Sequence, residues 1–289
     1  MIIDLHVHSN HSDGVLTVSE ILSEAEARKI KMLSITDHDS IEAQNPAINL
    51  AKDRDIRYVC GVELNITFSH PQYNPGKSIS LDFLGYAFDP NSQRLRDKLA
   101  QLSEYREERA TKILNNLNSE FEKEDLSPLT KGDFAAIQAS VDGVLGRPHI
   151  ADYLVKKGVV KSRQEAFDKY LVKCDVPKFP LHLEEASKLV RDAGGKIVLA
   201  HPNDPHGTSL VTLTRSLTEQ TKIIADSMVY LIDGLECWHS RNDAQTTEHY
   251  VGFAKQNNLL MTGGSDCHQK PLVMGTVKVP SYVANQFEI

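Results

Sequence analysis

The chain of 289 residues is 40% hydrophobic and 25% charged, a balance typical of a folded globular protein and not of a disordered one. Its net charge of −7 argues against a broad basic face for duplex nucleic acid, although bound metal cations would reverse the local field in an acidic cleft. Every apolar run is shorter than the roughly 18 residues that cross a bilayer, which argues against a membrane protein.

The N-terminal sequence and the cysteines predict a cytoplasmic protein. The first residues, MIIDLHVHSN, contain neither the basic region nor the apolar stretch of a signal peptide. The four cysteines are far apart and form no Cys-x-x-Cys pair, so we expect free thiols in a reducing compartment: Cys60, Cys174, Cys237 and Cys267.

Residues 1–90 alternate between strand and helix patterns. Apolar, β-branched segments predict strands over 2–7, 32–36, 57–62 and 81–87. Between them, helical spacing of apolar residues predicts helices over 17–30 and 45–54. This alternation indicates βα units around a parallel sheet.

The pattern changes between residues 91 and 185. Helical periodicity covers 93–121, 150–157 and 163–172, and we find no convincing buried strand there. We interpret residues 91–185 as a helical insertion that caps the site. It would separate a first α/β part, residues 1–90, from a second α/β part, residues 186–289.

Alternation resumes after the insertion. We expect helices over 183–193, 213–230 and 244–256, with Gly194-Gly195 as the stop signal of the first. The strands expected here cover 196–200, 234–237 and 259–262.

Histidines and carboxylates follow the ends of the predicted strands. His6 and His8 are two residues apart, so their imidazoles project from one face of a strand and can anchor a metal ion, although two surface histidines would give the same pattern. Active sites of α/β barrels lie at strand C-termini, so the coincidence of several such groups is the stronger signal. The other groups are Asp13, Asp37, His38, Asp39, Glu63, Asp82, His201, Asp266 and His268.

Each of these groups also has a simpler interpretation. Asp37 or Asp39 could cap a helix, Glu63 could be a surface residue, and Asp82 could lie at a strand edge. In the insertion, Gly146-Arg147-Pro148-His149 suggests phosphate recognition by charge-assisted hydrogen bonds. We interpret the remaining histidines as solvated or satisfied side chains, with His11 and His239 the first to reconsider: His11, His70, His182, His206, His239 and His249.

Taken together, these motifs resemble the polymerase-and-histidinol-phosphatase (PHP) family of metal-dependent phosphoesterases. The matching segments are DLHVHS (4–9), SDG (12–14), ITDHD (35–39), GVE (61–63), AHP around His201 and GSDCH (264–268). The resemblance implies an α/β fold, a distorted TIM-like barrel of seven βα units, with a helical insertion. Segment 146–171 resembles the branch of nucleoside 3′,5′-bisphosphate phosphatases and 5′-to-3′ exoribonucleases.

The resemblance also implies two or three divalent metal ions, which could be Mn, Fe or Zn. It assigns His6, His8, Glu63 and Asp266 to one ion, and Asp13, His38 and His268 to a second. A third ion would share Glu63 and add His201, with Asp82 where the branch usually supplies a histidine. All of these except Asp82 would form the catalytic set. Substrate phosphate would meet Arg106, Arg109, Arg147 and His149, together with Asp13 and His38.

We therefore expect hydrolysis of phosphate esters by a metal-activated hydroxide, with Asp37 orienting a histidine ligand. The expected substrates are nucleotide monoesters, such as a nucleoside 3′,5′-bisphosphate or an AMP-like molecule, or short 5′-phosphorylated RNA. Two alternatives are a histidinol-phosphate phosphatase and a non-catalytic, metal-stabilised binding module. A metal-dependent amidohydrolase also begins with His-x-His, but the Asp-x-His ending and the Asp13 turn favour the phosphoesterase.

Overall fold

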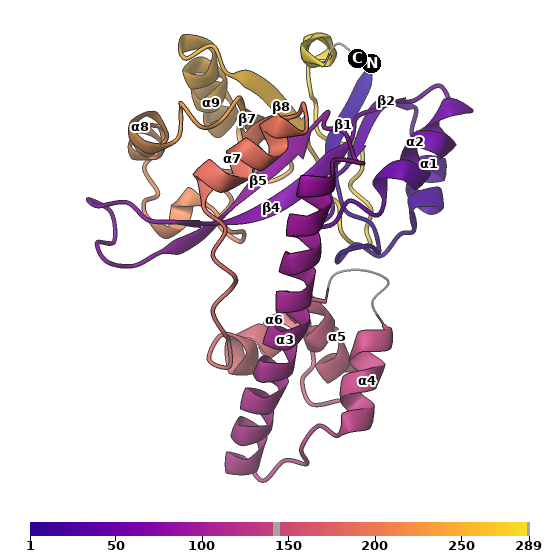
Figure 1. Cartoon of the computed structure of the whole chain (residues 1–289), viewed down its shortest axis with the longest axis vertical. Coiled ribbons are helices and arrows are strands. Elements are labelled where there is room, and N and C mark those ends of the chain that lie inside the picture. Colours follow the sequence, from indigo (N-terminus) through magenta and orange to yellow (C-terminus); the bar gives the residue numbers. More distant parts are fainter. Residues whose placement is uncertain (141–144, 288–289) are drawn as a thin grey trace.

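The structure is a computed structural model that describes residues 1–140 and 145–287. It has a mixed α/β architecture with two sheets (Figure 1). The first sheet is parallel and contains three strands: β1 (Ile2–Val7), β2 (Ile30–Ile35) and β3 (Arg57–Tyr58). The second has five strands in chain order: β4 (Gly61–Phe68), β5 (Ile79–Tyr86), β6 (Lys196–Leu199), β7 (Gly234–His239) and β8 (Leu260–Gly264).

The strand predicted over 57–62 is wrong in its extent. The chain leaves the first sheet at Tyr58, and β4 starts at Gly61 in the second sheet. A Cβ on Gly61 would lie 2.2 Å from the Ser34 hydroxyl oxygen and 2.8 Å from the Ile35 carbonyl oxygen. Only glycine therefore allows β4 to start so close to the end of β2.

The prediction of a parallel sheet holds for only part of the chain. Strands β6, β7 and β8 are parallel, but β4 pairs with β5, and β5 with β6, in antiparallel ladders. The connection between β4 and β5, residues 69–78, contains no helix. A chain that reverses directly into the next strand pairs antiparallel, because a parallel partner needs a longer crossover.

Helices cover both sheets. Helices α1 (Val18–Ala27) and α2 (Gln44–Lys52) contribute Ile21, Leu22 and Ala47 to one core with β1 and β2, and Thr17 starts α1 with a capping box. The second sheet carries α7 (Leu183–Asp192), α8 (Leu217–Ser227) and α9 (Ala244–Gln256). The predicted helix over 213–230 begins only at Leu217, because Ser216 accepts the Glu219 N–H as its cap.

The remaining helices lie between β5 and β6. They are α3 (Gln93–Lys123), α4 (Lys131–Ala139), α5 (Arg147–Lys156) and α6 (Arg163–Ala166), followed by a π-helical turn (Phe167–Leu171). Short 3₁₀ turns cover Leu210–Thr212 and Ser281–Gln286. Helix α3 joins two cores: Leu95 and Leu99 pack with the five-stranded sheet, whereas Leu117 and Phe121 pack with α4 to α6 (Figure 1).

The two sheets meet where their strands end. On one side, the His8 N–H donates to the Cys267 carbonyl at 3.1 Å and the Asp266 N–H to the His6 carbonyl at 2.8 Å. On the other, the Asp39 N–H donates to the Glu63 carbonyl at 2.8 Å. The ends of β1, β2, β4 and β8 therefore converge on one region. Within the described residues, no helix is long and apolar enough to span a membrane.

Candidate metal centre

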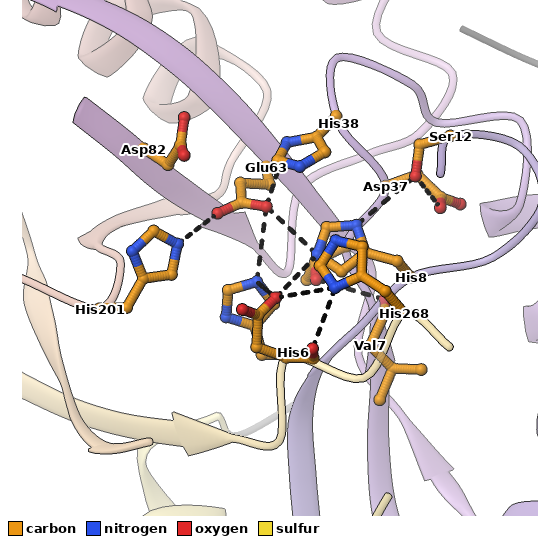
Figure 2. Close-up of polar contacts among 12 residues, drawn as sticks. His6, Val7, His8, Ser12, Asp37, His38, Glu63, Asp82, His201 and His268 are labelled. Atoms are coloured by element: carbon orange, nitrogen blue, oxygen red, sulfur yellow. Dashed lines mark hydrogen bonds and ion pairs between the residues drawn. The ribbon is translucent and has the colours of Figure 1, made fainter. Parts of the chain in front are cut away.

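Glu63 lies at the middle of the converging strand ends (Figure 2). One of its carboxylate oxygens, Oε1, is 3.0 Å from His201 Nε2. The other, Oε2, is 3.2 Å from His8 Nε2, 3.2 Å from His38 Nδ1 and 3.5 Å from His6 Nε2. One buried carboxylate thus faces four imidazoles that come from three separate segments of the chain.

Asp266 and Asp13 hold the other side of the cluster. Asp266 Oδ1 is 3.4 Å from Nε2 of both His6 and His8 and 3.3 Å from His268 Nδ1. Asp13 Oδ1 is 3.2 Å from His268 Nε2. We call the whole set the histidine–carboxylate cluster: His6, His8, Asp13, His38, Glu63, His201, Asp266 and His268.

Several buried atoms of this cluster have no hydrogen-bond partner. They include His6 Nε2 and His8 Nε2, which both face Glu63 Oε2, and Asp13 Oδ1, which faces His8 Nδ1 and His268. Buried polar atoms without partners are costly, and bound cations would satisfy them. Mixed imidazole nitrogens and carboxylate oxygens are suitable ligands for transition-metal ions such as Mn, Fe or Zn.

The electrostatics also fit a cationic occupant. Burial alone would lower the pKa of His8, but the adjacent carboxylates of Asp266 and Glu63 raise it to about 10. Burial would raise the pKa of Glu63, yet His38 and His6 hold it well below its usual range. Each carboxylate therefore stays ionised beside groups that can carry positive charge, and metal ions would replace the protons.

Potential ligand atoms fall into four overlapping groups. Within each group they lie no more than 4.8 Å apart: His6, His8 and Asp266; His8, Asp13, His38 and His268; His6, Glu63 and His201; and His38, Glu63 and Asp82. The three residues that the family resemblance assigned to the second ion, Asp13, His38 and His268, fall in one group. The first ion's expected ligands are together except for Glu63, and the third ion's expected ligands His201 and Asp82 fall in different groups. Asp82 lies with His38 and Glu63, and the Asn65 side-chain amide donates to it at 2.5 Å. Figure 2 shows Asp82 apart from the imidazoles.

Asp37, which was expected to orient a histidine ligand, is hydrogen-bonded to two serines. Its carboxylate accepts hydrogen bonds from the Ser9 N–H at 2.7 Å and from the Ser12 hydroxyl at 2.6 Å. The Ser12 hydroxyl lies 3.5 Å from His8 Nδ1. Asp37 is therefore linked to the His8 ring through Ser12, and it also fixes the loop that carries Asp13.

Two residues of β7 join the centre, although the sequence analysis did not assign them. Glu236 Oε1 is 3.0 Å from His6 Nδ1, and His239 Nε2 is 3.4 Å from Asp266 Oδ2. The sequence signal that could have identified Glu236 was the presence of a glutamate within an apolar strand. His11 stays outside the cluster, with its backbone N–H donating to the Ser9 hydroxyl at 3.1 Å.

A cavity of about 460 Å³ opens over the histidine–carboxylate cluster. Its other wall comes from α3 and the segments that follow it, including Arg106, Arg109, Arg147 and His149. Arg106 pairs with Asp39, and Asp175 pairs with both Arg109 and Arg147. The cavity is thus acidic and metal-binding in character on one side and cationic on the other, which suits a phosphorylated ligand.

Lys178 is a cavity residue that sequence reasoning missed. It forms no ion pair with the residues that the structure describes, and burial lowers its pKa to about 8 despite the nearby Asp82. His149 differs from the arginines, because burial lowers its pKa and its Nδ1 accepts the Gly146 N–H at 3.0 Å. A neutral His149 supplies a hydrogen-bonding group to this wall rather than a fixed positive charge.

Comparison with known proteins places this geometry in context. A family model described as PHP domain matches residues 4–173. A 5′-3′ exoribonuclease of Haemophilus influenzae is 30% identical, covering 92% of this chain and 89% of the relative. A 3′,5′-nucleoside bisphosphate phosphatase of Chromobacterium violaceum is 29% identical, covering 92% and 87%. A crystal structure from Bifidobacterium adolescentis, described as a candidate metal-dependent phosphoesterase, matches with a TM-score of 0.80 and 27% identity, covering 98% of this chain and 94% of that one.

Proposed function

The chain belongs to the PHP family of metal-dependent phosphoesterases, and from this premise we propose that it releases phosphate from nucleotides or from short 5′-phosphorylated RNA. The observation that carries the proposal is a metal-binding cluster and a cationic wall facing each other across one cavity. A phosphorylated substrate needs both: ligands for the reacting phosphate on one side and donors for its remaining anionic groups on the other.

The histidine–carboxylate cluster would hold two or three divalent ions. Such ions lower the pKa of water and neutralise negative charge on phosphate, so that no serine or cysteine nucleophile is needed. Glu63 would serve two metal positions, because its two oxygens face different imidazoles. Mn, Fe and Zn all suit the mixed nitrogen and oxygen ligands, whereas the position beside Asp82 has the more oxygen-rich donor set and would favour a harder ion.

The cationic wall would bind and orient the substrate. We assign phosphate binding to Arg106, Arg109 and Arg147, and we add Lys178. The carboxylates Asp39 and Asp175 hold the guanidinium groups in place, and the remaining N–H donors stay available. His149 would add a neutral hydrogen bond. Together these groups would hold the reacting phosphate against the metal ions.

We also propose that two parts of the chain have different roles. Residues 1–90 and 186–289 would form a distorted barrel, a proposal supported by isolated bridges between the two sheets at Val7–Cys267 and His38–Glu63. Residues 91–185 would form the cap, a proposal supported by the separate apolar core that residues 110–174 form within this range. Chemistry would then reside in the barrel and substrate selection in the cap.

A phosphate-release assay tests the proposal. Protein stripped with chelator and reloaded with Mn²⁺ would be offered adenosine 3′,5′-bisphosphate, AMP, histidinol phosphate and a short 5′-phosphorylated RNA. We expect Mn²⁺-dependent release from a nucleotide or the RNA that is lost in His6→Ala and Asp266→Asn. His182→Ala, at an exposed histidine outside the cavity, is the matched control. No release from any substrate by Mn²⁺-loaded protein, or release from histidinol phosphate alone, would overturn the nucleotide assignment.

A further inference from the structure

Strand β7 turns two buried polar side chains, Glu236 and His239, toward the same region. Residues three apart on a regular strand point to opposite faces. The ladder between β7 and β8 has a register shift here, because Glu236 pairs with Thr262 whereas Trp238 pairs with Gly263. One extra residue in β7 therefore brings both side chains to the histidine–carboxylate cluster, as β-bulges do elsewhere near functional sites.

Glu236 is fully buried and uses both carboxylate oxygens. Oε1 is 3.0 Å from His6 Nδ1, and Oε2 accepts the backbone N–H of His201 at 2.8 Å. Because Glu236 Oε1 is an acceptor, the ring proton of His6 lies on Nδ1. The other ring nitrogen, Nε2, then carries a lone pair, which faces the space beside Glu63 and Asp266. The second contact holds the backbone of His201, whose φ of 25° is unusual for a residue with a side chain.

His239 has an equally defined orientation. Its Nδ1 accepts the backbone N–H of Arg241 at 3.3 Å, so the ring proton is on Nε2. Nε2 lies 3.4 Å from Asp266 Oδ2. The other oxygen of Asp266, Oδ1, faces Nε2 of His6 and His8 at 3.4 Å. The His239 ring thus faces one oxygen of Asp266 at ion-pair distance, without a hydrogen bond, while the other oxygen is directed into the cluster.

We propose that Glu236 and His239 are positioning residues for the metal centre. Glu236 sets the tautomer and orientation of His6 and anchors His201, and His239 directs Asp266. Their contacts reach three of the side chains that surround the unpartnered buried atoms. The inference rests on the proposed metal-dependent function, and it assigns β7 a role that the ligand residues alone do not describe.

Matched substitutions separate positioning from simple packing. His239→Gln can present an amide N–H near the place of Nε2, whereas His239→Leu keeps the bulk and removes the donor. Glu236→Gln can accept from only one of its two donors, because its amide nitrogen then faces the other, and Glu236→Leu accepts from neither. Cys237→Ala is the control, since Cys237 lies between the two in sequence but packs into the core of the five-stranded sheet.

The experiment measures Mn²⁺ affinity of chelator-stripped protein by isothermal titration calorimetry, with thermal unfolding of the stripped protein in parallel. Loss of such supporting contacts typically weakens metal affinity or activity by about 10- to 100-fold, and we expect this for both leucine variants. Glu236→Gln should fall between wild type and Glu236→Leu. His239→Gln should remain close to wild type, and Cys237→Ala should change unfolding without changing Mn²⁺ affinity.

Wild-type Mn²⁺ affinity in both leucine variants would overturn the inference while leaving the proposed function intact. So would an affinity loss in Cys237→Ala as large as theirs, because loosened packing of β7 would then explain all three. A wild-type protein that binds no Mn²⁺ would instead refute the proposed function, so the two failures are distinguishable.

Discussion

Replacing Glu63 by glutamine is the most informative single change in the metal centre. The substitution keeps the size of the side chain and removes one negative charge. Glu63 is 1% exposed, and its oxygens lie 3.0 to 3.5 Å from four imidazole nitrogens. Two unit charges about 4 Å apart attract each other by about 4 kcal/mol at an effective dielectric constant of about 20. Burial leaves little solvent to screen that attraction.

A loss of about 4 kcal/mol corresponds to a roughly thousandfold weaker Kd. We therefore expect Glu63→Gln to lose Mn²⁺ at the positions it shares with His201 and with His38, and to lose phosphate release with it. Elemental analysis after equilibrium dialysis measures the bound metal, and circular dichroism verifies that the variant is folded. Glu42→Gln, an exposed site in the loop after β2, is the control. A folded Glu63→Gln protein that retains wild-type metal content and affinity would refute the central place we give to this carboxylate.

Three further outcomes follow from the same geometry. Arg147→Ala should raise KM by about 10- to 100-fold with kcat less affected, because a hydrogen bond to a charged group contributes about 1.5–3 kcal/mol. Arg163→Ala is the control, since Arg163 pairs with Asp152, and an equal rise in KM for this variant would contradict a specific phosphate contact of Arg147. Asp82→His should raise affinity for Zn²⁺ relative to Mg²⁺ in competition dialysis, because imidazole favours zinc, and an unchanged ratio would place Asp82 outside the metal site. In chelator, stability against urea should fall as pH rises from about 7 to about 10, because interactions with carboxylates outweigh burial and raise the pKa of His8 to about 10 and that of His201 to about 9. Histidines of the unfolded chain have pKa values near 6.5 and lose their protons above that pH, whereas the native state keeps them. The stabilisation is therefore complete below about pH 6.5 and is lost as the pH rises above it. A urea midpoint that does not change over this pH range would be the contrary result.

Sequence reasoning located the cluster because its members mark the places where apolar strands end. His6, His38, His201 and Asp266 each follow or end a hydrophobic segment, and parallel strands bring such ends together. The long helix α3 was equally visible, because its apolar periodicity continues without a glycine or proline.

Other features depend on contacts that a single sequence does not reveal. The antiparallel hairpin of β4 and β5 was missed because hydrophobic alternation looks the same in both strand directions. Glu236 and His239 reach the centre through a register shift between β7 and β8, a property of two paired strands and not of either alone. Lys178 lies in an irregular segment and becomes a cavity residue only through the approach of α3.

The shared helix α3 has an evolutionary consequence. Apolar residues of its first half pack with the five-stranded sheet, whereas those of its second half pack with α4 to α6. Side chains of the second core can therefore change as a set without disturbing the histidine–carboxylate cluster. Lineages that keep the same hydrolytic chemistry could diversify their substrates by remodelling everything beyond the middle of this one helix.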